Sequence, residues 1–494
     1  MYAEQQANLV LHTDKYQINM MYAHWKHNTH NKKAVFEAYF RKLPFGNGYA
    51  VSAGLERVVR YINSLRFDEA ALDYLREQEE NYDPAFLEEL KSFRFTGDLY
   101  ACEEGTLVFP NVPFLRVEGR IFEAQLIETA VLNFFNFQTL IATKAARIKV
   151  VAPDDILMEF GTRRAQEADA AIWGARAAYV SGFHATSNMR AGQLFGIPTK
   201  GTHAHAWVQD FDSEEEAFTR FADALPGQST LLVDTYDTLK SGVPNAIKVA
   251  KRLAAQGDGK TVQAIRLDSG DLAYLSIEAR KMLDAAGLTH VKIVASNDLD
   301  EHTILHLKAQ GARIDSWGIG TQLITAADHP ALGGVYKLVA KETADGTLAP
   351  TIKISGNPEK ITTPGLKNVY RIISRETGKA VGDYLTLQSE TDAAKGEPLT
   401  LFDPVHTYLN KTITEYDAVD LLTPIYQKGE QVYELPTLDA IREHHRQQIG
   451  LFWPETLRLL NPEPYHVSLS KQTYDMKMQM IHGMKEKLNR DLNQ

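Results

Sequence analysis

The middle of the chain repeats one pattern, in which a short apolar run rich in β-branched residues leads into a polar loop and then a helical stretch. The apolar runs, which we expect to be strands, lie at 156–160, 230–233, 262–267, 291–295 and 314–317. The helical stretches lie at 168–178, 244–255, 272–286 and 301–310. Strands connected in this way are parallel, because each return to the sheet needs a crossover. The pattern predicts an α/β domain, and it fits a doubly wound sheet and a barrel equally well.

Polar residues stand at the carboxyl end of each predicted strand. In doubly wound sheets and in barrels alike, that edge of the sheet is where ligands bind. We therefore expect the functional residues to come from the loops that follow the strands.

Composition narrows the class of protein. The chain has 494 residues, 44% hydrophobic and 23% charged, which allows two or three globular domains. A formal net charge of −10 argues against a nucleic-acid partner, although a local basic pocket can still bind a small anion. Cys102 is the single cysteine, which excludes an intrachain disulfide and a multi-cysteine zinc site and fits a reducing compartment.

The sequence shows no sign of export or membrane insertion. Its first residues lack the basic and apolar stretches of a secretory signal, and no run of 18 apolar residues occurs. The apolar stretch at 131–141 is interrupted by two asparagines and a glutamine, which indicates a buried helix. We expect a cytoplasmic protein with no membrane partner.

Two glycine-containing motifs suggest phosphate binding. The sequence AAQGDGKT at 254–261 follows a helix and precedes a strand, whereas a phosphate loop runs from strand to helix, so we interpret it as a turn. The sequence GIGT at 318–321 follows a predicted strand, and its two glycines allow backbone N–H groups to approach a phosphate.

Acidic residues follow two of the predicted strands. Asp234 and Asp237 lie in LLVDTYDTLKSG, where they suit either a hydrated Mg²⁺ or turn and capping chemistry. In RLDSGD, Asp268 is suited to accept hydrogen bonds from sugar hydroxyls, and Arg266 is suited to meet a phosphate or a flat ring. A helix N-cap by Asp268 or Ser269 is compatible with that interpretation.

Adjacent arginines, Arg163 and Arg164, follow the first predicted strand in EFGTRRAQ. Guanidinium groups suit a carboxylate or a phosphate, because they donate two parallel hydrogen bonds. Since arginine opposes the dipole at a helix N-terminus, we favour an anion site over a solvated helix start.

The segment KGTHAHAWVQ places His203 and His205 two residues apart. On a strand these rings would share a face, so a metal pair is one reading, although no third ligand is evident. A packed, hydrogen-bonded histidine is the second reading. The third is an imidazole that accepts a phosphoryl group and passes it on.

Seven motifs in collinear order together resemble those of the nicotinate phosphoribosyltransferase family. They are LHTDKYQ (11–17), EFGTRRAQ (159–166), GTHAHAW (201–207), RLDSGD (266–271), SNDLDE (296–301), GIGTQL (318–323) and PGLKNVYR (364–371). Each motif alone is weak, whereas the ordered set is specific.

The resemblance implies an α/β fold of the type II phosphoribosyltransferase kind. An irregular (β/α) barrel at 146–349 would lie beside a mixed α/β domain, which consists of 1–145 completed by about 350–400, with a C-terminal extension at 400–494.

The implied reaction converts nicotinate and 5-phosphoribosyl-1-pyrophosphate to nicotinate mononucleotide and pyrophosphate. It is coupled to ATP hydrolysis, requires Mg²⁺ and belongs to NAD salvage. The family also implies a homodimer with shared active sites.

The resemblance assigns roles to single residues. His205 matches the histidine that ATP phosphorylates, and with Arg266 and Asp268 it forms the implied catalytic set, whereas His203 occupies a variable position and is expected to be structural. The implied nicotinate residues are Phe160, Arg163, Arg164 and Tyr16, the last stacking from the partner subunit. The implied phosphoribosyl and phosphate residues are Asp268, Ser269, Asn297, Gly318, Gly320 and Thr321, with Asp298 nearby.

Three other functions fit the sequence less well. A nicotinamide phosphoribosyltransferase would need an acid to bind the amide, and RRAQ supplies none. Quinolinate phosphoribosyltransferase shares the fold but is much shorter and would not need the histidine. A non-catalytic regulator that binds pyridine nucleotides would not need every motif together.

Overall fold

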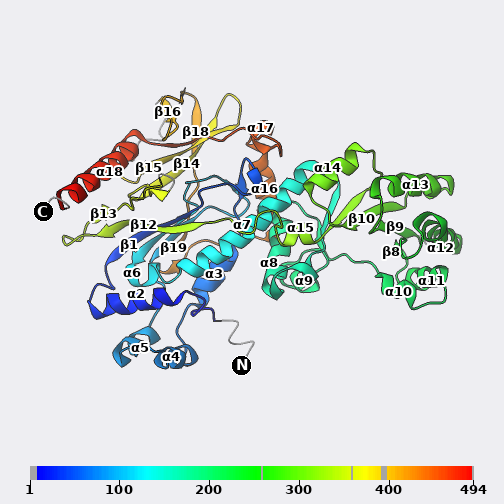
Figure 1. Ribbon diagram of the computed structural model, residues 1–494, viewed down its shortest axis with the longest axis horizontal. Helices are drawn as coiled ribbons and strands as arrows, with labels where there is room; N and C mark the ends of the chain where they lie inside the picture. Colours follow the sequence, from blue (N-terminus) through cyan, green and yellow to red (C-terminus); the bar gives the residue numbers. More distant parts are fainter. Residues whose placement is uncertain (1–7, 258–259, 358–359, 391–397, 492–494) are drawn as a thin grey trace. The chain divides into compact units, whose positions relative to one another are not determined.

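The computed structural model describes residues 8–257, 260–357, 360–390 and 398–491. These residues divide into two compact units, one that runs to Leu140 and resumes at Ala331, and one formed by Ile141–Pro330 (Figure 1). The boundary falls within the 24-residue helix α7 (Glu128–Val151), which contains the buried helix predicted at 131–141. The domain limits expected from the sequence stay a prediction.

The unit Ile141–Pro330 is built on a parallel sheet with the strand order β7-β6-β11-β10-β9-β8. Among the described residues no pairing joins β8 back to β7, so the sheet is half of a barrel. The strands are β6 (Ile156–Glu159), β7 (Ala185–Thr186), β8 (Ser229–Leu232), β9 (Val262–Leu267), β10 (Lys292–Asn297) and β11 (Ser316–Ile319). All except the two-residue β7 were predicted, because a strand that short carries no hydrophobic pattern.

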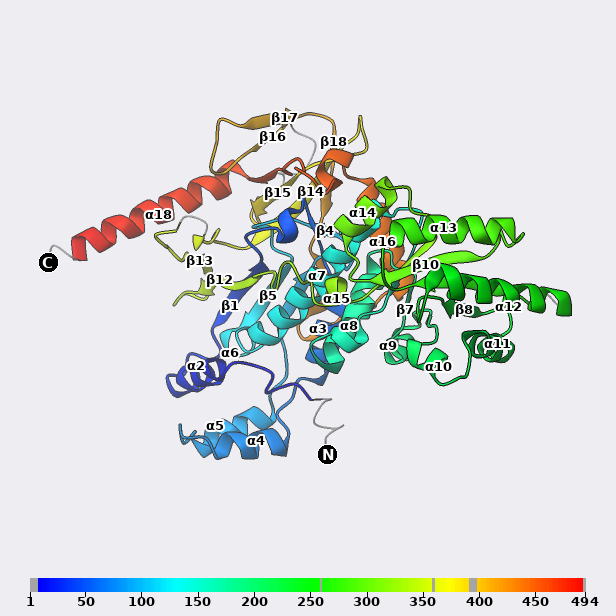
Figure 2. The same ribbon diagram turned by 45° about the vertical axis from the view of Figure 1, so that its right-hand side comes forward.

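Helices connect these strands as the sequence predicted. Helices α12 and α13 contact each other and pack along β9 and β10 (Figure 2). The helices of this unit are α8 (Glu167–Val180), α9 (Met189–Phe195), α10 (His205–Gln209), α11 (Glu214–Ala224), α12 (Val243–Gln256), α13 (Leu272–Ala285), α14 (Glu301–Ala309) and α15 (Thr321–Ile324). The AAQGDGKT motif begins in the last turn of α12 and ends just before β9, so it runs from helix to strand, although residues 258–259 lie outside the described residues.

The other unit contains a seven-stranded antiparallel sheet, in the order β13-β12-β1-β5-β3-β19-β20. Its strands are β1 (Lys33–Tyr39), β3 (Asp98–Ala101), β5 (Leu115–Arg120), β12 (Val335–Glu342), β13 (Leu348–Pro350), β19 (Thr423–Gln427) and β20 (Glu430–Gln431). Strands β19 and β20 pair as a tight antiparallel hairpin, with Gln427 opposite Glu430. A second sheet has the order β18-β14-β15-β21, formed by β18 (Tyr416–Asp420), β14 (Lys367–Ser374), β15 (Ala380–Leu387) and β21 (Val467–Leu469).

Helices surround these two sheets. They include α2 (Lys15–Lys26), α3 (Leu55–Ser64), α4 (Glu69–Arg76), α5 (Pro84–Lys91), α16 (Leu438–Gly450) and α18 (Lys471–Asp491). In the described part of the chain, no helix combines the length and the apolar character needed to cross a bilayer.

The motif PGLKNVYR lies in the core of this unit. Lys367 Nζ lies 2.9 Å from Glu37 Oε2, and both side chains are 1% exposed. Arg371 pairs with Asp383 at 2.9 Å, equally buried, and its guanidinium lies 5.0 Å from the centre of the Phe452 ring. Both cations of this motif are therefore paired within the core, where loss of either carboxylate partner would leave a buried charge uncompensated.

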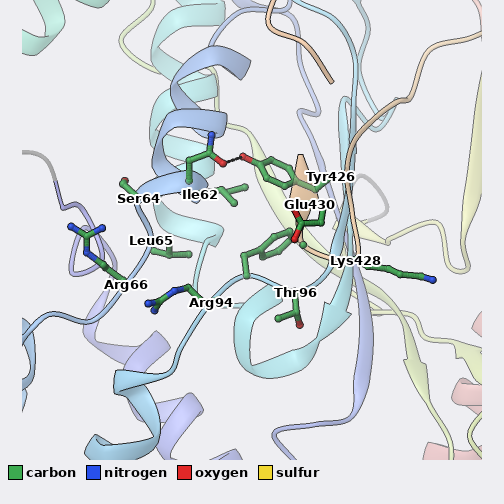
Figure 3. A pocket seen from close by; sticks show the side chains of 12 residues that line it. Ile62, Ser64, Leu65, Arg66, Arg94, Thr96, Tyr426, Lys428 and Glu430 are labelled. Carbon is green, nitrogen blue, oxygen red and sulfur yellow. Dashed lines mark hydrogen bonds between the residues drawn. The ribbon is translucent and has the colours of Figure 1, made fainter. Parts of the chain in front are cut away.

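A hollow of about 390 Å³ opens on the same unit between the end of α3 and the β19–β20 turn (Figure 3). The Tyr426 hydroxyl at its wall hydrogen-bonds Val59 O at 3.1 Å and Asn63 Oδ1 at 2.8 Å. No residue of the seven sequence motifs lines this hollow.

Candidate functional site

Most of the site residues expected from the sequence follow the carboxyl ends of the half-barrel strands. Because these strands are parallel, their carboxyl ends lie on the same side. The loops after these ends carry Phe160 with the arginine pair (β6), Asp234 (β8), Asp268 (β9), Asp298 (β10), and Gly320 with Thr321 (β11).

Arg266 and Asp268 connect neighbouring strands at this edge. Arg266 donates to Asp268 Oδ1 at 2.8 Å, to Ser296 Oγ at 2.7 Å and to Thr202 Oγ1 at 2.9 Å. Ser296 Oγ in turn donates to Asp268 Oδ1. Burial raises the pKa of Asp268, but the Ser296 hydrogen bond and the charge of Arg266 lower that pKa by more, so the carboxyl stays ionised. Arg266 thus positions a negatively charged Asp268.

Asp234 and Asp237 have different roles in the loop after β8. Asp234 Oδ2 accepts hydrogen bonds from Asp268 N at 2.8 Å and Ser269 Oγ at 2.7 Å, while its buried Oδ1 has no hydrogen-bond partner among the described residues. Asp237 caps the short helix η3 (Thr238–Gly242) by accepting from two backbone N–H groups. The capping interpretation therefore describes Asp237, and Asp234 retains one oxygen for a ligand.

The alternative interpretation of Asp268 or Ser269 as a helix N-cap does not hold. The residue that caps α13 is Asp271, whose carboxylate accepts the Tyr274 N–H at 3.0 Å. Asp268 and Ser269 are instead engaged by Arg266 and Asp234.

The two histidines do not share a strand face, because His205 is the first residue of α10. His203 is 6% exposed, accepts the Leu232 N–H at Nε2 (3.1 Å) and packs against Phe218 and Phe221 of α11. Burial lowers the pKa of His203 to about 4, so its ring is neutral. The reading as a packed, hydrogen-bonded histidine is confirmed for His203.

His205 faces the edge of the sheet. Its side chain is 40% exposed, its Nδ1 lies 3.0 Å from Thr235 Oγ1, and its Nε2 lies 3.9 Å from Asp268 Oδ2. The ring is therefore oriented by one side chain and faces a carboxylate with its other nitrogen. In the described part of the chain, no group of three His, Cys, Asp or Glu side chains is arranged to bind a metal, so the metal-pair reading is unsupported.

The arginine pair lies in a single 3₁₀ turn, η2 (Thr162–Arg164), and both side chains are exposed. Next to it, Phe160 N donates to Ile319 O at 2.8 Å. A Cβ on Gly318 would lie 2.5 Å from the Phe160 ring, so the glycine within β11 makes room for that ring. Gly320 follows the strand and precedes α15.

The remaining predicted residues differ in their placement. Asn297 ends β10 with a φ of +124°, a conformation that is rare for a residue with a Cβ and is often found at functional sites. Asp298 and Ser269 are exposed at the same edge. Tyr16, 49% exposed on α2, belongs to the other unit.

Sequence reasoning gave no role to three hydroxyl residues that orient this site. Thr235 contacts His205, Thr202 contacts Arg266, and Ser296 bridges Arg266 and Asp268. Their positions inside the quoted stretches GTHAHAW, SNDLDE and LLVDTYDTLKSG were the available signal, but small hydroxyl residues are common after strands.

Family models match most of the chain. They are the nicotinate phosphoribosyltransferase N-terminal domain (residues 11–136), the nicotinate phosphoribosyltransferase family (156–377) and the nicotinate phosphoribosyltransferase C-terminal domain (366–477). The chain is 53% identical over 487 residues to nicotinate phosphoribosyltransferase of Bacillus subtilis, covering 99% of this chain and 98% of that protein. It is 43% identical to nicotinate phosphoribosyltransferase pncB2 of Mycobacterium tuberculosis, covering 92% and 90%.

Solved structures have the same fold. The crystal structure of human nicotinic acid phosphoribosyltransferase superposes with a TM-score of 0.84 at 31% identity, covering 94% of this chain and 99% of that one. Nicotinate-nucleotide pyrophosphorylase from Pyrococcus furiosus gives a TM-score of 0.68 at 24% identity, which is a likeness of fold alone. The expected type II phosphoribosyltransferase fold is confirmed.

We predict that replacing His203 by glutamine changes how stability depends on pH. The folded protein keeps this ring neutral down to about pH 4, whereas the unfolded chain protonates it near 6.5. The stability from the neutral ring is therefore fully present above pH 6.5 and is lost as pH falls towards 4, by at most about 1.4 kcal/mol per pH unit. The advantage of the parent over His203→Gln in thermal midpoint should shrink between pH 7 and pH 5. A constant advantage would contradict the assignment.

Proposed function

Because the chain belongs to the nicotinate phosphoribosyltransferase family, we propose that the carboxyl edge of its half-barrel transfers the phosphoribosyl group of 5-phosphoribosyl-1-pyrophosphate to nicotinate. The products are nicotinate mononucleotide and pyrophosphate, the reaction is coupled to ATP hydrolysis, and it serves NAD salvage. The full-length identity to enzymes of that name supports this function. The assignment of the site rests chiefly on the His205 ring. Thr235 orients this ring, and the ring faces Asp268 at the edge of the sheet that also bears the arginine turn.

Arg163 and Arg164 are proposed to bind the nicotinate carboxylate. Both guanidinium groups are exposed, and charge-assisted hydrogen bonds to a carboxylate are about twice as strong as neutral ones. Phe160 lies beside this turn and offers a face for the pyridine ring. Nicotinamide would lose the charge-assisted contacts, which favours nicotinate over the amide.

Asp268 is proposed to bind the ribose hydroxyls. Its carboxylate is kept ionised and held by Arg266 and Ser296, so it also stabilises positive charge that develops at the sugar carbon C1 in the transition state. The 5′-phosphate is assigned to the backbone of Gly320 and Thr321 at the end of β11, with Asn297 at the neighbouring strand end. Gly318 would contribute indirectly, by making room for Phe160.

The transfer step needs positioning more than a strong base. The pyridine nitrogen attacks C1 of the ribose, the new C–N bond forms, and the C–O bond to pyrophosphate breaks. The arginine turn would fix one reactant and Asp268 the other, which lowers the entropic cost of bringing them together.

His205 is proposed to accept the γ-phosphoryl group of ATP. If Nδ1–H donates to Thr235 Oγ1, Nε2 carries the lone pair that attacks phosphorus, and ADP leaves as the N–P bond forms. The negative charge of Asp268, 3.9 Å from Nε2, stabilises the positive charge that the ring gains. Asp268 therefore faces both the phosphorylated histidine and the sugar, which provides a physical route for coupling ATP hydrolysis to transfer.

A magnesium ion fits one part of this site. Mg²⁺ in proteins is usually bound by one or two carboxylates together with phosphate oxygens, and it would neutralise charge on the leaving pyrophosphate. Asp234 supplies a buried oxygen without a hydrogen-bond partner among the described residues, so its chemistry fits the ion. The carboxylate of Asp237 is engaged in capping η3, so we propose Asp234 and not Asp237.

We further propose a homodimer in the cytoplasm. Tyr16 is an exposed aromatic residue in the unit that does not carry the sheet edge, which is compatible with its stacking on nicotinate in the partner subunit. Cys102 is fully buried, and burial raises its pKa to about 12. The thiol is therefore protected from oxidation in a reducing and in an oxidising compartment alike. The proposed location rests only on the small number of cysteines in the sequence.

The function is tested by assaying nicotinate mononucleotide with nicotinate, 5-phosphoribosyl-1-pyrophosphate and Mg²⁺, with and without ATP. We expect His205→Ala to lower ATP hydrolysis by at least about a hundredfold while weak, ATP-independent transfer remains, because the nucleophile is lost but the transfer site is kept. The matched control is His306→Ala, an exposed histidine on α14, which should behave like the parent. Parent-level ATP hydrolysis by His205→Ala would refute the phosphohistidine, and equal use of nicotinamide would refute the proposed substrate.

Shared active sites are tested by subunit complementation. Tyr16→Ala and His205→Ala chains with different tags are co-expressed, and the mixed dimer is purified through both tags. If Tyr16 acts in the partner's site, one of the two sites is intact and the mixed dimer should show about half of the parent rate. Failure to recover activity would place both residues in one subunit's site, and failure of the two tags to co-purify would exclude a stable dimer.

A further inference from the structure

Glu159, the last residue of β6, is a buried carboxylate that has no role in the mechanism above. It is 1% exposed and forms no ion pair with any lysine or arginine of the described residues. A buried charge without a cation partner is costly unless hydrogen bonds compensate it. The structural reason for this carboxylate therefore lies in the groups that donate to it.

Two donors from different loops share this one side chain. Gly161 N–H donates to Oε1, and the Thr186 hydroxyl donates to Oε2 at 2.6 Å. Burial raises the pKa of Glu159, and the two hydrogen bonds partly offset that rise. Each oxygen of the side chain accepts one of these two hydrogen bonds, so both donors are satisfied by the same carboxyl group.

The first donor begins the arginine turn. The carbonyl oxygen of Gly161 accepts the N–H groups of Arg164 at 2.8 Å and Ala165 at 3.1 Å, so both sides of this residue are fixed. A Cβ on Gly161 would lie 2.5 Å from Ile324 Cβ and 2.8 Å from Glu159 Oε1, so only glycine allows this close approach. The orientation of the turn thus depends directly on the Glu159 carboxylate.

The second donor is itself firmly anchored. Thr186 is completely buried, and its hydroxyl oxygen accepts the Asn188 N–H at 3.0 Å. Its backbone N–H donates to Pro198 O, and its carbonyl oxygen accepts the Lys200 N–H, each at 3.0 Å. Lys200 opens the segment that carries His205, so Thr186 connects the arginine side of the edge to the start of the histidine segment.

We propose that Glu159 is a positioning residue for nicotinate, which uses Thr186 as its anchor to hold the arginine turn in the orientation that meets the substrate carboxylate. Glu159 does not contact substrate in this account; it acts through the Gly161 peptide. The proposal rests on the proposed function, because it assumes that Arg163 and Arg164 bind nicotinate.

Two variants each remove a hydrogen bond through which Glu159 connects Gly161 to Thr186. Glu159→Gln keeps the size of the side chain but offers one acceptor oxygen, so one donor is left without a partner. Thr186→Val removes the hydroxyl and keeps both the carboxylate and the side-chain shape. The matched control is Thr186→Ser, which retains the hydroxyl.

We expect Glu159→Gln and Thr186→Val to raise the KM for nicotinate about tenfold, the lower range for losing a hydrogen bond to a charged group. The KM for 5-phosphoribosyl-1-pyrophosphate and the ATP hydrolysis rate without nicotinate should stay within about twofold, since those contacts lie on other strands. Thr186→Ser should resemble the parent. A positioning role changes the KM for nicotinate alone, whereas general damage to the fold would change both KM values and the ATP hydrolysis rate.

An unchanged nicotinate KM in Thr186→Val, or equal increases for both substrates, would overturn the proposal. If Glu159→Gln fails to fold, Thr186→Val alone decides, because it leaves the carboxylate in place. Failure of the parent enzyme to form nicotinate mononucleotide would instead refute the proposed function, so the two failures are distinguishable.

Discussion

The interaction on which the candidate site depends is the set of hydrogen bonds around the Asp268 carboxylate. Arg266 and Ser296 donate to one of its oxygens, and Asp234 accepts from its backbone N–H, so the ends of β8, β9 and β10 are joined at one point. These contacts keep the group charged despite its partial burial. In the proposed mechanism this fixed negative charge would stabilise both the positive charge that the His205 ring gains and the positive charge that develops on the ribose.

Side chains of the same chemical type have different surroundings in this unit, and these surroundings give them different roles. His203 and His205 are two residues apart, yet one ring is enclosed by phenylalanines and held neutral, whereas the other is exposed and oriented by Thr235. The carboxyl groups differ in the same way: Asp268 is paired with a cation, whereas the partners of Glu159 among the described residues are two uncharged donors. The first arrangement suits charge stabilisation in a reaction, and the second suits the precise placement of a neighbouring loop.

The sequence predicted the repeating strands and helices because their hydrophobic periodicity is strong, and it predicted where the site would lie because parallel strands place their polar ends on one edge. It left alternatives open, or gave no role, where a polar residue's partner is decided by tertiary structure. Spacing alone suggested a common strand face for the histidines, but His205 begins a helix. The cap of α13 is Asp271 instead of Asp268 or Ser269, and the cations of PGLKNVYR are paired in the core. Glu159 had no signal of its own, since its role depends on Thr186, which is distant in sequence.

The central claim is that anion-binding groups from separate strands act on one pair of substrates at the carboxyl edge of the half-barrel. The most direct measurement is a crystal structure of the enzyme with nicotinate mononucleotide and pyrophosphate. The account predicts the pyridine carboxylate at Arg163 and Arg164, the ribose hydroxyls at Asp268, and the 5′-phosphate at the backbone of Gly320 and Thr321. A nucleotide bound away from these strand ends, with Asp268 remote from its ribose, would contradict it.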